Sequence, residues 1–362
     1  AAVKRNTART LWEPRRVKNT QYCDNALPKW LLVLTCLSFM GAPTVCANES
    51  LDADFGGFFF GDFYHIPSHH TDEGDGASGA VLRRLLLAAD STFSEKWSGR
   101  ARFEAYHEGA FENYTMTHRI LDLGLTTKLG AHQLSGGLIP TITYDVLEAF
   151  WGKRYLVRTA PDIQGIAARD VGLKVMGPLS FAEGLSYRVM YGAKATWEAD
   201  KNPFNKVMAG ITWRGSTGLL IDAYIDSESR PGAYDRSTVQ FLIGKKTEQY
   251  TLGLEYLNQD RGEDPDLELA TLMGVIKLGG PWSAMAQLHR LFKPSVKGND
   301  IAYIPFDPTA KATNLVAGVE YRFNSHFTVS PNIVWTHYGV NELGVQPDDD
   351  VHLRLTFYVN FE

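Results

Sequence analysis

The final stretch of the sequence, Val351–Phe361, alternates without a break between apolar and polar residues. Successive side chains of a β-strand point to opposite faces, so this stretch predicts a strand with one apolar and one polar face. The apolar face would carry Val351, Leu353, Leu355, Phe357, Val359 and Phe361, and the polar face His352, Arg354, Thr356, Tyr358 and Asn360. About ten residues is the length that a tilted strand needs to cross a bilayer. One such strand would equally suit the edge of a soluble sandwich, so the interpretation depends on whether the pattern recurs.

The same pattern recurs from Phe55 onward. We predict about sixteen strands, at Gly57–Ile66, Ala80–Ser91, Trp97–Glu108, Thr117–Lys128, His132–Ile139, Ala168–Met176, Gly184–Ala193, Asn205–Trp213, Thr217–Asp226, Ser237–Lys245, Gln249–Asn258, Leu267–Leu278, Pro281–Leu291, Ala312–Phe323, His326–His337 and Asp350–Phe361. Their connections tend to alternate between short turns and long polar loops, which is the asymmetry of a transmembrane barrel. No run of helical periodicity stands out after residue 47, which disfavours βαβ folds. The sequence therefore predicts an all-β fold, a transmembrane antiparallel β-barrel that occupies residues 48–362.

Residues 1–47 have the pattern of a secretory signal with an upstream leader. Basic residues precede the short apolar run Leu31–Met40, and the small residues Val45 and Ala47 follow it, so we expect cleavage after Ala47. A lipoprotein signal at Cys46 is the weaker alternative, because Pro43-Thr44-Val45 makes a poor lipobox.

Composition excludes several classes for the remainder of the chain. All three cysteines lie within residues 1–47, so a disulfide framework or a thiolate metal site is not expected after them. Seven of the 36 basic and two of the 41 acidic residues also lie there, which leaves 29 and 39 and a net charge of −10. This acidic balance argues against a nucleic-acid partner.

The longest interruption of the strand pattern, residues 140–167, follows the fifth predicted strand. It carries the apolar residues Tyr144, Phe150, Trp151 and Tyr155, so we expect it to pack against other parts of the protein. A sixteen-stranded barrel encloses an aqueous channel, and long ordered loops are usually functional. We therefore expect this third outer loop to fold into the lumen and narrow it. The alternatives are that it caps the barrel mouth or contacts a neighbouring subunit.

Fixed charges at such a constriction would select ions, because they lower the barrier for counter-ions and raise it for co-ions. The loop offers basic Lys153, Arg154 and Arg158, and acidic Asp145, Glu148 and Asp162. Strand parity places further charges inside the wall, namely Arg100, Arg102, Glu104, Asp170, Lys174 and Arg188. Strict alternation allows only one of the adjacent Arg83 and Arg84 to point inward. For each of these residues, simple hydration of the lumen is the alternative role.

Several short motifs resemble the phosphate-selective porin O and P family. They are Val81-Leu82-Arg83-Arg84, Trp97-Ser98-Gly99-Arg100-Ala101-Arg102, Gly137-Leu138-Ile139-Pro140, Glu148, Arg154-Tyr155, Pro161, Arg169-Asp170-Val171-Gly172, and Leu185-Ser186-Tyr187 to Gly192. The resemblance is best over about residues 80–195. It implies a homotrimer of sixteen-stranded barrels with basic residues along an anion path, and Arg84, Arg154 and Arg169 stand where the family carries basic residues.

Other polar clusters are interpreted as solvated loops. His65, His69 and His70 precede Asp72, Glu73 and Asp75, a mixture able to bind a divalent cation, but no metal-loop spacing is met. The acidic stretches Asp348–Asp350 and Glu263–Asp266 either bridge to lipopolysaccharide through divalent ions or are simply hydrated. We predict no metal site, no cofactor and no catalytic site.

The expected function is that of a porin in the bacterial outer membrane, surrounded by lipid and lipopolysaccharide. It would let small hydrophilic solutes and ions diffuse passively, with anions such as phosphate preferred. The alternative is a barrel enzyme or a non-conducting structural barrel.

Overall fold

Sixteen β-strands make up most of the part of the chain that the structure describes. The structure is a computed structural model and describes residues 53–107, 109, 115–166, 168–193, 205–231, 233–295 and 297–361. They belong to one compact unit, Leu51–Glu362. The predicted signal sequence, residues 1–47, lies outside the described residues. No described helix is both long enough and apolar enough to span a membrane.

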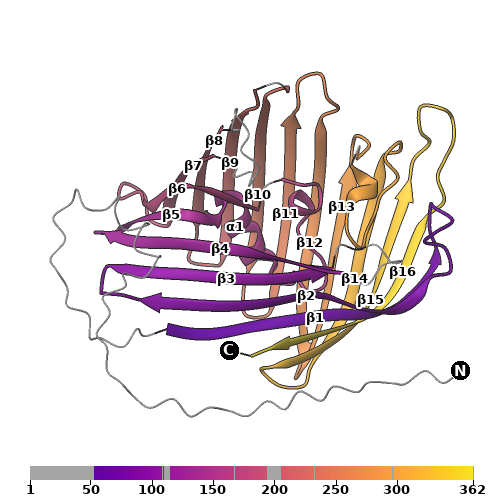
Figure 1. Ribbon diagram of the computed structural model, residues 1–362, viewed down its shortest axis with the longest axis horizontal. Helices are drawn as coiled ribbons and strands as arrows, with labels where there is room; N and C mark the ends of the chain where they lie inside the picture. The colour runs from indigo at the N-terminus through magenta and orange to yellow at the C-terminus, as the bar shows by residue number, and fades with distance from the viewer. Residues whose placement is uncertain are drawn as a thin grey trace, which may run out of the picture. The chain divides into compact units, whose positions relative to one another are not determined.

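The strands follow one another in the order that the sequence predicts (Figure 1). They are β1 Ala53–Ser68, β2 Ser78–Thr92, β3 Trp97–His107, β4 Met116–Leu129, β5 His132–Pro140, β6 Arg169–Pro178, β7 Leu185–Gly192, β8 Asn205–Arg214, β9 Leu219–Ser229, β10 Arg236–Lys246, β11 Tyr250–Asp260, β12 Leu267–Gly279, β13 Trp282–Leu291, β14 Ala312–Arg322, β15 Phe327–Tyr338 and β16 Asp350–Asn360. All sixteen predicted segments are confirmed, with ends that differ by at most four residues.

The strands close into a barrel. Each pairs antiparallel with the next, and β1 pairs with β16 through a register that joins Phe58 to Asn360 and Tyr64 to Arg354. The closed ring leaves no free sheet edge, which is the condition for a sheet to stand in hydrocarbon. The predicted antiparallel β-barrel of about sixteen strands is confirmed.

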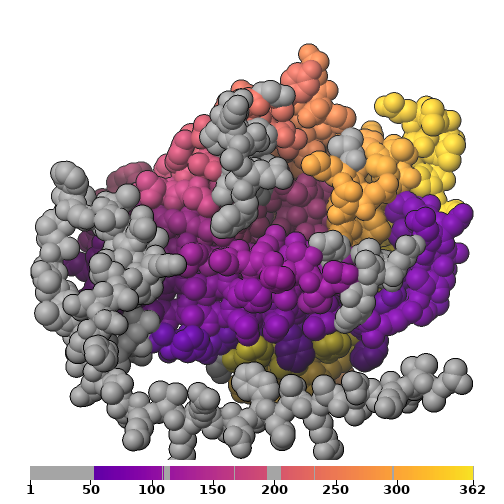
Figure 2. All heavy atoms as spheres, in the orientation of Figure 1, coloured from indigo at the N-terminus to yellow at the C-terminus, as the bar shows by residue number. Residues whose placement is uncertain are grey.

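The barrel wall has an apolar exposed face and a polar buried face. On β11, Leu252 and Leu254 are 53% and 52% exposed, whereas Glu255 is 0% exposed. Because the sheet is closed, the buried face is the one that points inward. Figure 2 shows the side chains of the early strands, indigo to magenta, across the near face. At the short-turn end, Trp282 stacks edge-on against Tyr321 with ring centroids 4.6 Å apart, as expected for an interfacial aromatic girdle.

A β-bulge places two adjacent arginines on the inner face. Phe60 pairs with Arg84 and Gly61 with Leu82, so Arg83 has no residue opposite it. Arg83 and Arg84 are both buried. The prediction that only one of them can point inward is wrong, because the extra residue of a bulge breaks the strict alternation of a strand.

Within the described residues, three short helices interrupt the strands: α1 Ile142–Trp151, α2 Ala160–Ile163 and the 3₁₀ helix η3 Gly298–Asp300. The expectation of a chain without helices after residue 47 is therefore wrong at α1. Its buried residues Ile142, Val146, Leu147, Phe150 and Trp151 share one helix face, a spacing visible in the sequence. The helix ends at Gly152, whose φ of 66° is left-handed and costs glycine no Cβ clash.

Candidate functional site

The segment between β5 and β6, residues 141–168, contacts strands all around the barrel wall. Near its start, the Thr143 hydroxyl donates a hydrogen bond to Gln240 on β10, which is buried. The ring of Phe150 lies against β10 and β11, where a Cβ at Gly244 would come within 2.2 Å of it. Lys246 Nζ donates to a carbonyl of α1 at 2.7 Å. The first half of the segment is thus held by β10 and β11.

The second half of the segment contacts β14, β16 and β2. Lys153 Nζ lies 2.6 Å from the carboxylate of Glu320 on β14, and the Tyr155 hydroxyl donates to the same carboxylate. The rings of Tyr155 and Tyr358 on β16 have centroids 4.9 Å apart. On β2, the Arg83 guanidinium donates to the carbonyl of Tyr155. These partners lie on strands well separated around the ring, and Arg83 and Glu320 are buried.

Arg154 lies at the centre of the charges on this segment. Its Nη1 is 2.9 Å from Glu148 on α1 and 2.5 Å from Asp162 on α2. Burial lowers the pKa of Arg154, but the two carboxylates outweigh it and raise that pKa above its ordinary value. Burial raises the pKa of Asp162, and Arg154 with Arg158 more than offsets it, so the pKa of that carboxyl lies below its ordinary value. Arg154 and Asp162 therefore remain charged at neutral pH.

Arg158 differs from the other cations of the segment. Among the described residues, none forms a hydrogen bond or an ion pair with its guanidinium, and Asp162 is the charge that raises its pKa most. Burial lowers the pKa of Arg158 from its ordinary value, but a guanidinium stays protonated at neutral pH. Arg158 thus presents a positive charge that no carboxylate of the described residues meets at ion-pair distance.

The cations of the neighbouring wall are paired with carboxylates one or two strands away. Arg84 Nε lies 2.6 Å from Glu104 on β3. Arg169 on β6 lies 2.9 Å from Asp122 on β4, and Arg102 approaches the same carboxylate at 3.7 Å. These pairs tie β2, β3, β4 and β6 together across the inner face of the wall.

A second group of predicted residues lies on β3 and β6. Arg100 pairs with Asp90 at 2.7 Å. Lys174 Nζ pairs with Asp145 of α1 at 2.6 Å. Asp170 is buried, but it packs on Gly192 and does not line the cavities described below. Arg188 on β7 pairs with Asp222 on β9 at 2.7 Å and does not line these cavities either. The structure thus brings all the predicted charges except Asp170 and Arg188 into one connected region.

Four cavities follow one another through this region and share lining residues. A cavity of about 530 Å³ and one of about 250 Å³ are both lined by Arg84 and Arg154. The smaller one shares Arg158 with a third cavity of about 480 Å³, next to the β13–β14 loop. At the other end, the first shares Arg100 and Asp145 with a cavity of about 420 Å³. Arg84 and Arg154 therefore stand where the two central cavities meet.

In most of these pairs the cation is nearer the cavity and the carboxylate lies behind it. The side chain of Arg102 is 25% exposed and that of Asp122 only 1%. The side chain of Arg322 is 59% exposed and that of its partner Glu320 2%. Arg154 is 23% exposed against 11% for Asp162. These pairs are close to neutral in total, but they turn their positive ends toward water, whereas in the Lys174–Asp145 pair the carboxylate is the more exposed group.

Sequence reasoning missed the partners that the wall supplies. Glu320 and Arg322 were visible only as the polar face of one strand, and nothing local indicated that Lys153 and Tyr155 would reach them. Asp122 lies beside a second irregularity, where the β3–β4 register shifts between Arg102 and Phe103. The polar face of each strand was the signal for these residues, whereas their partners depend on the closed fold.

Comparisons with known proteins support the fold. No protein-family model and no curated protein matches the sequence. An anion-selective porin from Comamonas acidovorans is similar in structure, with a TM-score of 0.59 and 11% identity over 86% of this chain and 100% of that chain. OmpF of Salmonella typhi, in complex with daunomycin, also has a TM-score of 0.59, with 12% identity over 86% and 99%. A loop-deletion mutant of OmpT, an outer membrane protein of Vibrio cholerae, reaches 0.59 with 14% identity over 86% and 100%. The fold of this chain is that of outer-membrane porins.

Proposed function

We propose that this chain is an outer-membrane porin through which small hydrophilic solutes diffuse passively, with a preference for anions. The observation that carries the proposal is the junction of the two central cavities, which Arg84 and Arg154 line together. An apolar outer wall with a series of polar cavities inside it is suited to moving hydrophilic solutes across a bilayer.

We further propose that residues 141–168 fold into the lumen and form its constriction. The segment contacts inward-facing Gln240, Glu320 and Arg83 on strands distributed around the ring. A loop that capped the mouth or met a neighbouring subunit would not reach buried wall residues on β10, β14 and β2 together. The apolar face of α1 supplies the packing, and its charged residues face the cavities.

The anion preference follows from the orientation of the ion pairs. Seven basic and three acidic residues line the cavity of about 530 Å³: Arg84, Arg100, Arg102, Lys153, Arg154, Arg169 and Arg322, against Asp145, Glu148 and Glu320. Cations at the water boundary with carboxylates behind them create a positive potential in the channel. Unpaired Arg158 adds to it on the side of the β13–β14 loop. The anion selectivity named for the Comamonas acidovorans porin, which shares the fold, supports this proposal.

The finer predictions from sequence are retained as proposals. We propose that residues 1–47 direct the chain to the outer membrane, where it lies in lipid and lipopolysaccharide as a homotrimer. A trimeric form of OmpT from Vibrio cholerae, with a TM-score of 0.55, supports the oligomeric state. Inorganic phosphate is the proposed solute, on the motifs that resemble phosphate-selective porins.

Planar-bilayer recordings of the purified protein test the function. We expect the current to rise in steps as open channels insert. In a KCl gradient, the sign of the reversal potential should show that chloride permeates more readily than potassium. Absence of any current would refute the channel, and a reversal potential of zero or of the opposite sign would refute the anion preference alone. Replacing chloride with phosphate tests the solute: a phosphate permeability no greater than that of sulfate would remove the proposed phosphate preference.

A further inference from the structure

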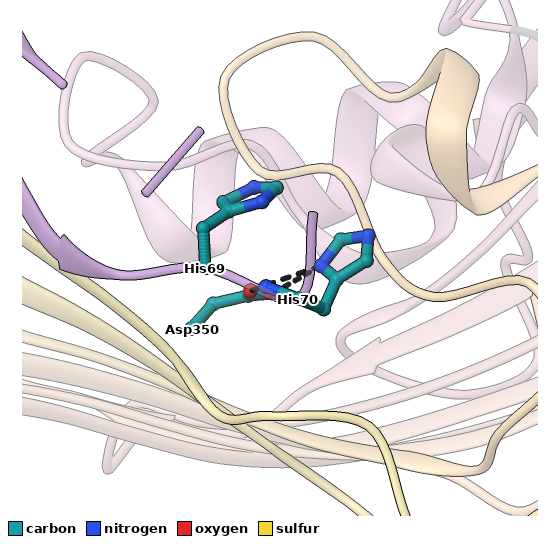
Figure 3. A group of neighbouring side chains, drawn as sticks. All are labelled: His69, His70 and Asp350. Carbon is teal, nitrogen blue, oxygen red and sulfur yellow. Dashed lines mark hydrogen bonds and ion pairs between the residues drawn. The ribbon is translucent and has the colours of Figure 1, made fainter. Parts of the chain in front are cut away.

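Two polar clusters that are far apart in the sequence meet at the end of the barrel where the long loops lie. His69 and His70 directly follow β1, and Asp350 is the first residue of β16. Asp350 Oδ1 accepts hydrogen bonds from the backbone N–H of His70 at 2.7 Å and lies 2.9 Å from its Nδ1. The rings of His69 and His70 stack with centroids 4.4 Å apart. In Figure 3 the Asp350 carboxylate points at His70, and the ring of His69 lies beside them. The interpretation of these residues as solvated loop tips is therefore wrong.

The cluster is buried and leaves two imidazole nitrogens unsatisfied. His69 is 8% exposed, and the side chains of His70 and Asp350 are 2% and 3% exposed. Nδ1 of His69 contacts Thr71, and Nδ1 of His70 contacts Asp350. The Nε2 atoms of both histidines are buried without a hydrogen-bond partner among the described residues. Burying such an unsatisfied group is unfavourable unless something binds it.

The three side chains together offer the donors of a transition-metal site. One ligand atom from each lies within 4.8 Å of the other two. Two imidazoles and one carboxylate suit Zn²⁺ and its neighbours, whereas Ca²⁺ and Mg²⁺ prefer oxygen ligands alone. We propose that His69, His70 and Asp350 bind one divalent transition-metal ion, Zn²⁺ being the ion that fits this donor set best.

The geometry needs only a small adjustment to hold the ion. Ligand atoms around a tetrahedral Zn²⁺ with bonds of about 2.0 Å lie about 3.3 Å apart. The ligand atoms of His69, His70 and Asp350 lie within 4.8 Å of one another, so the longest of these distances must shorten by at most about 1.5 Å. The Tyr338 hydroxyl donates to Asp350 and orients its carboxylate, an arrangement that typically supports metal ligands. Gly74 lies so close to His69 that a Cβ there would come within 2.5 Å of the ring. A bound ion would fasten the loop after β1 to the first residue of β16.

Isothermal titration of the detergent-solubilised full chain with ZnCl₂, after removal of metal with EDTA, tests the site. We expect one Zn²⁺ per chain, and binding weakened at least roughly tenfold by His69→Ala, His70→Ala or Asp350→Asn. Gly74→Ala keeps every ligand but displaces the His69 ring, so it should weaken binding as well. X-ray absorption of the loaded protein should show two imidazole nitrogens at about 2.0–2.1 Å.

His337→Ala is the matched control. His337 forms an ion pair with Asp349 at 2.9 Å in the same region, but it is half-exposed, and within the described part of the chain no second imidazole completes a metal site there. Its removal should leave Zn²⁺ binding unchanged. Heat-modifiable migration on gels identifies the variants that fold, and His70→Gln replaces His70→Ala if the latter does not. The proposal is overturned if the wild type binds no Zn²⁺, if the ligand variants bind as tightly as the wild type, or if the spectrum lacks imidazole. None of these readouts depends on ion conduction.

Discussion

Removal of the Arg158 charge should reduce the anion preference of the channel. Arg158 lines two of the cavities and has no ion-pair partner among the described residues, so Arg158→Gln removes one positive charge without exposing an uncompensated carboxylate within ion-pair distance. This separates it from Arg154, whose removal would leave both Glu148 and Asp162 unpaired.

The size of the effect follows from Coulomb's law. An ion passing about 8 Å from a unit charge in water interacts with it by about 0.5 kcal/mol. Loss of that energy lowers the local concentration of an anion about twofold and raises that of a cation about twofold. The ratio of chloride to potassium permeability should therefore fall roughly two- to fivefold. The effect should be clear near 0.1 M salt and nearly vanish at 1 M, where the screening length is about 3 Å.

Reversal potentials in KCl gradients, at low and at high mean salt, measure this ratio. Arg290→Gln is the control, because Arg290 shares the outer face of β13 with exposed Leu288 and carries the same charge. It should leave the reversal potential unchanged. If folded Arg158→Gln channels kept the wild-type reversal potential at 0.1 M, or if the control shifted it equally, Arg158 would not act on the permeating ions.

Three further predictions concern the segment 141–168. Glu320→Gln breaks a buried ion pair with Lys153, so the free energy of unfolding, measured with urea in micelles, should fall by about 3 kcal/mol. The current through the open channel should also become noisier, and noise at the wild-type level would contradict the proposed anchoring. Gly244→Val forces its side chain into the ring of Phe150, so the segment should shift and the single-channel conductance change, whereas an unaltered conductance would refute the packing. Because neighbouring arginines lower the pKa of Asp162, the carboxylate stays ionised from pH 8 to 5, and ion selectivity should be constant there. Anion preference should rise only when the pH falls below the ordinary pKa range of carboxyl groups, because protonation of Asp162 then removes its negative charge. Asp162→Asn removes the same charge at every pH, so it should show the raised preference already at pH 7.

The barrel could be predicted from the sequence because its signal is local. Each strand must present one face to hydrocarbon and the other to water, so the alternation is repeated in every segment, as in Leu252, Leu254 and Glu255 of β11. The same alternation predicted that the side chains of Arg102 and Lys174 point into the barrel.

What the sequence could not predict depends on distant partners or on single irregular residues. The bulge at Arg83 depends on the register in which β1 pairs with β2, and no residue within β2 indicates it. Asp350 and His70 are 280 residues apart, and only closure of the ring brings them together. Helix α1 was missed although its apolar spacing was present, because a ten-residue helix inside a loop is short compared with the surrounding strand pattern.

The seam between β1 and β16 has a consequence for assembly. It joins residues about 300 positions apart, so the cylinder closes only when the sixteenth strand pairs with the first. Until Asp350–Asn360 is in place, the first and fifteenth strands each present a row of backbone amides and carbonyls that hydrocarbon cannot solvate. A chain that lacked Asp350–Asn360 could therefore not form the closed sheet that the bilayer requires.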